Sequence, residues 1–121
     1  MKHKLLDNVK KELIIELRKK GKLEKKDFLL ALSRALDVSS RRLSSVNVYK
    51  LDKLAKKNKD KVFLVPGVIL AYGYLTSKIK IYAYRYSKNA LEKINEVKGE
   101  AKTLNDLLKD KVEAKDVMII K

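Results

Sequence analysis

The sequence has no cysteine, no tryptophan, one proline and one histidine, His3, in 121 residues. Without cysteine the chain can form neither disulfides nor thiolate metal sites. It also lacks a G-x-S-x-G motif, a glycine-rich phosphate loop and any metal-ligand spacing of histidines or carboxylates. Most acidic residues fall among lysines at helical spacing, where surface ion pairing explains them. We therefore expect no catalysis, no metal, no cofactor and no small-molecule substrate.

A hydrophobic run long enough to cross a membrane is also missing. The longest charge-free stretch, residues 62–77, contains Pro66, two glycines and two tyrosines, and it is shorter than the roughly 20 apolar residues that a spanning helix needs. At the N-terminus, charges interrupt the apolar residues, which is unlike a signal peptide. We expect residues 62–77 to form the centre of a core, with no membrane partner and a cytoplasmic location.

Acidic residues are few compared with basic ones, 15 against 30, and the net charge is +15. Solubility of a small domain requires only about 2–8 net charges. Such an excess is typical of proteins that bind a polyanion, and nucleic acid is favoured because no lipidation motif or anchor accompanies the charge. The length fits one domain. We divide it into a helical lead (1–37), a basic arm with a short helix (38–61) and an α/β core (62–121).

Two helices are predicted in the lead, over residues 4–20 and 24–36. The first has an apolar stripe at three- and four-residue steps, made by Leu5, Leu6, Val9, Leu13, Ile14 and Leu17. Gly21 follows two lysines, which predicts that this helix ends there. We assign the first helix no functional role.

The core segment predicts strands and helices in alternation. Residues 62–65 and 68–70 are apolar runs on either side of Pro66 and Gly67, which predicts a hairpin with a tight turn. A strand over 79–86 follows, then a helix after Ser87 that Gly99 closes, a capping box from Thr103 to Asp106, and a final strand over 117–120. Helices first and alternating elements afterwards predict an α/β fold.

The window 38–61 is the strongest candidate for binding a polyanion, because it has eight basic and two acidic residues. The serine-rich stretch SSRRLSS predicts a loop or arm that carries Arg41 and Arg42. Asn47 can cap a short helix whose outer face is basic, with Lys50, Lys53, Lys56 and Lys57. Arginine forks and lysines in this arrangement suit a phosphate backbone. The alternative interpretation is a lysine face that is merely solvated.

Two further features of the core could contact RNA. Alternation along 79–86 places Tyr82, Tyr84 and Tyr86 on one face, where they could stack on unpaired bases or pack beneath a neighbouring helix; packing is favoured. Arg85 and Lys88 flank the start of the helix after Ser87, where free backbone N–H groups could hold a phosphate.

Four stretches, taken in order, carry a family resemblance: SSRRLSSVNVYKLDKLAK, VFLVPGVILAYGYL, IKIYAYRYSKNALEKI and AKTLNDLL. Together they resemble the archaeal and eukaryotic large-subunit ribosomal protein family designated eighteen-e, over about residues 38–120, and the short chain resembles archaeal members. Three features depart from the family pattern: Val68 stands where a basic residue is expected, Tyr82 stands where small residues are usual, and the expected glycine-containing turn before the segment VMII is missing.

The resemblance implies a structural component of the large ribosomal subunit that binds large-subunit ribosomal RNA and neighbours other ribosomal proteins. It further implies an irregular superhelix of strand-strand-helix turns, a fold shared with the bacterial fifteenth large-subunit protein. Arg41 and Arg42 would form the RNA-facing arm, with 47–57 near it. Two alternatives stay open: a free-standing RNA- or DNA-binding accessory protein of the same fold, and a basic adaptor for acidic proteins.

Overall fold

The computed structural model describes residues 2–120, with the side chains of residues 9–39 and 41–120. The chain forms two compact units, Met1–Leu43 and Ser44–Lys121. The boundary falls inside the expected arm segment 38–61, so Arg41 and Arg42 belong to the first unit and the helix after Asn47 to the second. The mixed α/β fold class is confirmed, with helices leading and a parallel sheet following.

The first unit is a pair of packed helices, α1 (Lys2–Leu23) and α2 (Asp27–Leu36), followed by a short 3₁₀ helix, η1 (Ser40–Arg42). The predicted stripe of α1 holds at Leu13, Ile14 and Leu17, which are buried, and fails at Val9, which is exposed. The side chains of Leu5 and Leu6 lie outside the described residues.

The predicted end of the first helix at Gly21 is wrong, since α1 continues to Leu23. A Cβ atom at Gly21 would lie 3.0 Å from the Leu30 side chain, so the missing side chain lets α1 and α2 approach closely. The left-handed residue that ends the helix is Lys25, with φ 55°. The Lys26 N–H then donates to the Gly21 carbonyl at 2.9 Å, the bond expected of a Schellman ending.

The second unit is built on a five-stranded sheet in which every pairing is parallel. Its strands are β1 (Ser44–Asn47), β2 (Val62–Leu70), β3 (Lys80–Tyr86), β4 (Glu100–Thr103) and β5 (Val117–Ile119). The order is β1-β2-β3-β4, and β5 also pairs with β2. Because β3 occupies one edge of β2, β5 and β1 share the other, β5 along Val62–Leu64 and β1 along 67–70.

The predicted hairpin at Pro66 and Gly67 is wrong, because β2 runs unbroken through both residues. Proline has no N–H to donate to a ladder, and here it lies where β2 changes partner from β5 to β1 and its register with β3 shifts. A Cβ atom at Gly67 would lie 2.1 Å from the Ser44 carbonyl oxygen. Gly67 is therefore the residue that lets β1 approach β2.

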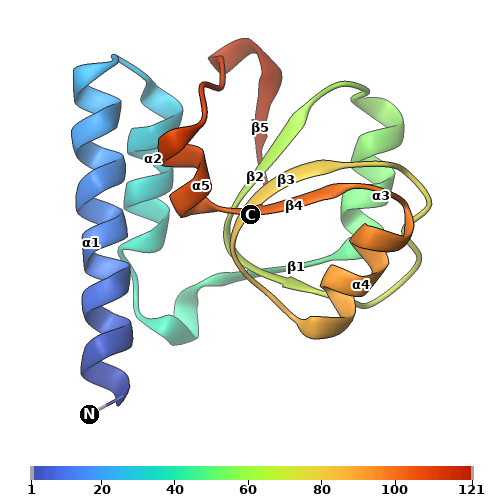
Figure 1. Ribbon diagram of the computed structural model, residues 1–121, viewed down its shortest axis with the longest axis horizontal. Coiled ribbons are helices and arrows are strands. Elements are labelled where there is room, and N and C mark those ends of the chain that lie inside the picture. The colour runs from blue at the N-terminus through green and yellow to red at the C-terminus, as the bar shows by residue number, and fades with distance from the viewer. Residues whose placement is uncertain (1, 121) are drawn as a thin grey trace. The chain divides into compact units, whose positions relative to one another are not determined.

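Three α-helices and a short 3₁₀ helix complete the described part of this unit: α3 (Val48–Lys57), α4 (Lys88–Glu96), α5 (Leu104–Lys109) and η2 (Ala114–Asp116). The helices α3 and α4 lie on one side of the sheet and α5 on the other (Figure 1). Beneath α3 and α4 lies the main core, which includes Val46, Leu51, Phe63, Val65, Ile69, Ile81, Ala83 and Ile94. A parallel sheet covered on both faces explains why β2 is apolar along nearly its whole length.

The local predictions for this unit are largely confirmed. Ser87 caps α4 by accepting from the Ala90 N–H at 3.2 Å, and Thr103 and Asp106 form the capping box of α5. Two were incomplete. The stretch expected to be a loop around Arg41, which crosses the boundary between the two units, contains η1 and the first residues of β1. The strand β4 was not predicted.

Candidate nucleic-acid interface

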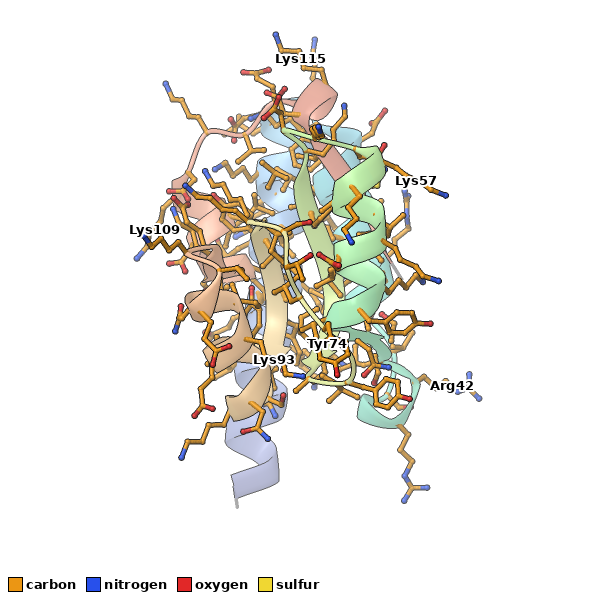
Figure 2. The ribbon with its side chains drawn as sticks, turned by 90° about the vertical axis from the view of Figure 1, so that its right-hand side faces the viewer. Arg42, Lys57, Tyr74, Lys93, Lys109 and Lys115 are labelled. Atoms are coloured by element: carbon orange, nitrogen blue, oxygen red, sulfur yellow. The ribbon has the colours of Figure 1, made fainter. Side chains whose placement is uncertain are left out.

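The helix α3 presents a basic face because its apolar residues are fixed inward by the core. Val48 and Leu51 are fully buried, and Leu54 and Ala55 pack partly against the same core. The predicted contact residues of this helix are exposed on its remaining surface: Lys50, Lys53, Lys56 and Lys57. Figure 2 shows Lys57 extending outward from α3. The helix thus holds several ammonium groups on one solvent-facing surface.

Asp52 is the buried exception on this basic helix. Its Oδ1 accepts from the backbone N–H groups of Thr76 at 3.0 Å and Ser77 at 2.9 Å, and its Oδ2 lies 3.3 Å from the Lys56 Nζ. Burial by itself raises the pKa of Asp52, but these hydrogen bonds outweigh it and lower the pKa to about 2. Asp52 therefore anchors the loop 71–79 to α3 and compensates the charge of Lys56 in part.

A cavity of about 610 Å³ opens beyond the C-terminal end of α3. Four lysines and one aspartate are among the residues that line it: Lys56, Lys59, Lys61, Lys78 and Asp60. We call it the lysine cleft. It brings residues of the basic window together with Lys78, which sequence reasoning did not connect with them. An oxyanion such as a phosphate suits a cleft with this charge.

Arg41 and Arg42 are both exposed on η1, where the Arg42 N–H donates to the Ser39 carbonyl at 2.8 Å. Figure 2 shows the Arg42 side chain pointing into solvent. Asn47 belongs to the second unit, is half-buried at the end of β1, and occupies the N-cap position of α3 without a capping hydrogen bond from its side chain. The position of the expected cap is thus correct, but its capping hydrogen bond is not formed.

Arg85 and Lys88 lie on either side of the Ser87 cap, and both are exposed. The Arg85 guanidinium carbon lies 5.1 Å from the centre of the Tyr84 ring, a distance typical of a cation–π contact. The Ser87 hydroxyl already accepts the Ala90 N–H, so a phosphate here would use the earlier N–H groups of α4.

Tyr82 and Tyr86 are packing residues, as favoured, whereas Tyr84 is half-buried beside Arg85. Tyr82 is fully buried and its hydroxyl donates to Asp110 Oδ2 at 2.5 Å; Tyr86 donates to the Lys102 carbonyl at 2.6 Å. Burial raises the pKa of both tyrosines. The Tyr82 hydroxyl and the Lys102 ammonium, 3.0 Å from the same oxygen, lower the pKa of Asp110.

Exposed tyrosine rings occur elsewhere in the second unit, at Tyr49, Tyr72 and Tyr74. Sequence reasoning missed them because Tyr72 and Tyr74 lie within the charge-free stretch assigned to the core.

Among residues 2–120, no helix is both long and apolar enough to span a bilayer. The described side chains also include no group of three or more histidines and acids placed to hold a metal ion.

No family model matches the chain. The chain is 30% identical over 109 residues to the large ribosomal subunit protein eL18 of Methanothermobacter thermautotrophicus, covering 90% of this chain and 88% of that protein. It is 31% identical over 114 residues to eL18 of Sulfurisphaera tokodaii, covering 94% and 92%. A third relative, eL18 of Picrophilus torridus, is 30% identical over 117 residues, covering 97% and 90%.

Proposed function

The chain belongs to the eL18 family of large ribosomal subunit proteins, and on this basis we propose that it is a non-enzymatic constituent of that subunit in the cytoplasm. It binds large-subunit ribosomal RNA through a basic surface and neighbours other ribosomal proteins. The observation that carries the RNA-binding part is the row of exposed lysines on α3. The contact residues we propose are Arg41, Arg42, Asn47, Lys50, Lys53, Lys56, Lys57, Arg85 and Lys88.

The spacing of the lysines on α3 suits a chain of phosphates. Lys50, Lys53 and Lys57 recur at steps of three and four residues, so they lie along one side of the helix. At 1.5 Å per residue they extend over about 10 Å. Several phosphates can be contacted along such a row, whereas one small anion would meet only one or two of the lysines.

The helix that carries this row of lysines is held firmly in the fold, which favours a role in binding over a role in solubility alone. Leu51 anchors the middle of α3 in the core, and Asp52 ties the helix to the loop 71–79. Helix orientation is therefore set before RNA arrives, which reduces the entropy lost on binding. Each lysine that contacts a phosphate releases condensed counterions, and this release drives the association.

Arg41 and Arg42 supply a different kind of contact. A guanidinium can donate two parallel hydrogen bonds to one phosphate, which a lysine cannot do. Both are exposed on a short 3₁₀ turn, and neither is needed to fill the core. We expect them to fix position on the RNA, while the α3 lysines contribute most of the charge neutralisation.

The test removes charge from α3 and compares it with equal removal elsewhere. We expect Lys50→Ala/Lys53→Ala/Lys57→Ala to weaken binding to large-subunit ribosomal RNA and to lower the salt slope of log Kd by roughly one per lost contact. The matched control, Lys11→Ala/Lys19→Ala/Lys22→Ala, changes the net charge equally on the exposed face of α1 and should have much less effect.

Arg41→Ala/Arg42→Ala should weaken binding while leaving stability within about 0.5 kcal/mol, as at ordinary surface sites. Filter binding gives the affinities, and cosedimentation with large subunits through a high-salt wash tests assembly. Wild-type affinity in the α3 variant, or an equal loss in the α1 control, would contradict the proposed surface. Absence of the wild-type protein from washed large subunits would indicate a free-standing RNA-binding protein instead.

A further inference from the structure

Three exposed tyrosines lie on the N-terminal turn of α3 and on the loop that packs against it. Tyr49 lies in the first turn of that helix, and Tyr72 and Tyr74 lie on the loop 71–79 that follows β2. Their exposed fractions are 40%, 75% and 86%. The rings of Tyr49 and Tyr72 meet edge to face, with centres 6.2 Å apart and planes at 83°. We call these three residues the tyrosine platform.

The loop that carries two of these rings is held at several points. From α3, Asp52 accepts the N–H groups of Thr76 and Ser77. From α4, the Lys93 ammonium donates to the carbonyls of Ala71 and Gly73, both at 2.6 Å. Tyr74 and Lys93 are both labelled at the lower end of α3 and α4 in Figure 2. An acid from one helix and a base from another thus fix a single short loop.

Gly73 brings the loop against Tyr49. It has φ +92°, which favours glycine, and a Cβ atom there would lie 2.3 Å from the Tyr49 Cβ. The Tyr49 N–H also donates to the Tyr72 carbonyl at 3.3 Å. Large rings that are exposed on a backbone fixed in this way are not the by-product of a loose loop, because the fold specifies their position.

The chemistry of the platform combines ring faces with a cation. The Lys53 ammonium lies 5.3 Å from the centre of the Tyr49 ring. In an edge-to-face pair, at least one ring keeps its faces clear of its partner. Exposed aromatic faces stack on bases of any sequence, and a neighbouring cation contacts the phosphates between them. A partner with an apolar surface would not suit this site, because it would cover the ammonium group of Lys53.

We propose that the tyrosine platform stacks on one or two unpaired nucleotides of RNA, with Lys53 at the adjoining phosphate. This rests on the proposed function, since it names the class of RNA that this end of the basic surface recognises. Bases in a duplex are stacked on each other and expose no faces, so only looped-out or single-stranded nucleotides fit. The lysines farther along α3 accept either form of RNA, because they contact phosphates alone.

The test compares a short single-stranded RNA oligonucleotide containing 2-aminopurine with the same strand in a duplex. We expect Tyr72→Ala/Tyr74→Ala to weaken single-strand binding by roughly 5- to 150-fold, the range for loss of base–aromatic stacking. The affinity of this variant for the duplex and the melting temperature of the protein should stay unchanged. The quenching of 2-aminopurine on binding should be lost. Tyr72→Phe/Tyr74→Phe should bind like the wild type, because stacking uses the ring and not the hydroxyl.

Leu23→Ala, at a position 85% exposed on α1, is the control for losing an exposed apolar side chain and should change neither affinity. Equal losses for single strand and duplex, or a phenylalanine variant as weak as the alanine one, would overturn stacking. Normal RNA binding with poor incorporation into large subunits would assign the platform to a protein neighbour instead. If the wild-type protein binds neither RNA, the proposed function fails together with the platform. If the wild-type protein binds single-stranded RNA and the alanine variant binds it equally well, only the platform is wrong.

Discussion

Asp52 stabilises the fold although it lies on the helix whose lysines form the proposed RNA-binding surface. It lies among exposed lysines of α3, yet its own side chain is buried and accepts two backbone N–H groups of the loop 71–79. Removing a buried acceptor leaves those N–H groups without a partner, which costs more than the net gain of an ordinary hydrogen bond. The carboxylate is therefore part of the fold, although the lysines around it on the helix are exposed.

The first prediction concerns the charge of Asp52. Its pKa is about 2 in the folded state, below the value of about 3.9 expected of an unfolded chain. The carboxylate therefore stabilises the fold above about pH 4 by roughly 2 kcal/mol, and this contribution disappears as the pH falls towards 2. Asp52→Asn keeps an oxygen for the two N–H groups but removes the charge, so it should lower the free energy of unfolding by about that amount at pH 7.

Urea unfolding of both proteins at several pH values checks this prediction. The difference between wild type and Asp52→Asn should shrink as the pH is lowered from 4 towards 2. Asp116→Asn, at an exposed position, is the control and should differ little from wild type at pH 7. A constant difference at all pH values would show that the charge of Asp52 is not the source of the stability.

Among the elements, β2 decides how the second unit is assembled. It pairs with β3 along one edge and with β5 and β1 in turn along the other. Pro66 lies where the partner changes, so its missing N–H leaves no ladder bond broken. Gly67 lies where β1 begins to pair, and it is needed there because the Ser44 carbonyl occupies the space a side chain would take. Within a strand, proline thus marks the place where the pairing changes, and glycine marks the place where another backbone approaches closely.

The second prediction tests Gly67 as the contact point of β1 and β2. Gly67→Ala places a methyl group 2.1 Å from a backbone oxygen, which cannot move without shifting the strand. We expect a loss of about 1–3 kcal/mol or more, as for overpacked sites. Gly21→Ala is the matched control: a methyl group there would lie 3.0 Å from the Leu30 side chain and 3.2 Å from the Leu29 Cβ, so α2 must give way by only a few tenths of an ångström, and alanine favours a helix interior over glycine by about 1 kcal/mol. Thermal unfolding should separate the two variants clearly; equal stabilities would contradict the role of Gly67.

For the molecule as a whole, the excess of basic residues dominates. The chain has 30 basic side chains and 15 acidic ones, and at least three of those acids, Asp52, Asp106 and Asp110, accept hydrogen bonds from groups of the fold. A net charge this far from zero repels itself and raises the local concentration of anions around the protein. Binding a polyanion relieves the repulsion, so the affinity should depend strongly on ionic strength.

The third prediction is the size of that dependence. If the protein contacts six to ten phosphates of large-subunit ribosomal RNA in a duplex-like geometry, its affinity should fall by roughly 10³–10⁵ between 50 and 200 mM salt. Fluorescence anisotropy with a labelled ribosomal RNA fragment gives the slope of log Kd against log salt. A flat line would contradict binding through phosphates, whatever the affinity at one salt concentration.

The sequence determined the features that depend on near neighbours. The apolar periods located the helices, Ser87 and the Thr103–Asp106 pair marked two helix starts, and the basic window located the lysines of α3. These signals act over three or four residues, within the reach of one helical turn, so they can be read without knowing the fold. The charge excess and the family resemblance likewise needed no coordinates.

Tertiary structure decided what depends on residues far apart in the chain. Pro66 and Gly67 look like a turn until β1, β3 and β5 are seen to line the strand that contains them. Asp52 meets its loop 24 and 25 residues farther along, and the tyrosine platform joins a helix to that same loop. No local pattern encodes such meetings, because they arise only when the burial of the sheet brings distant segments together.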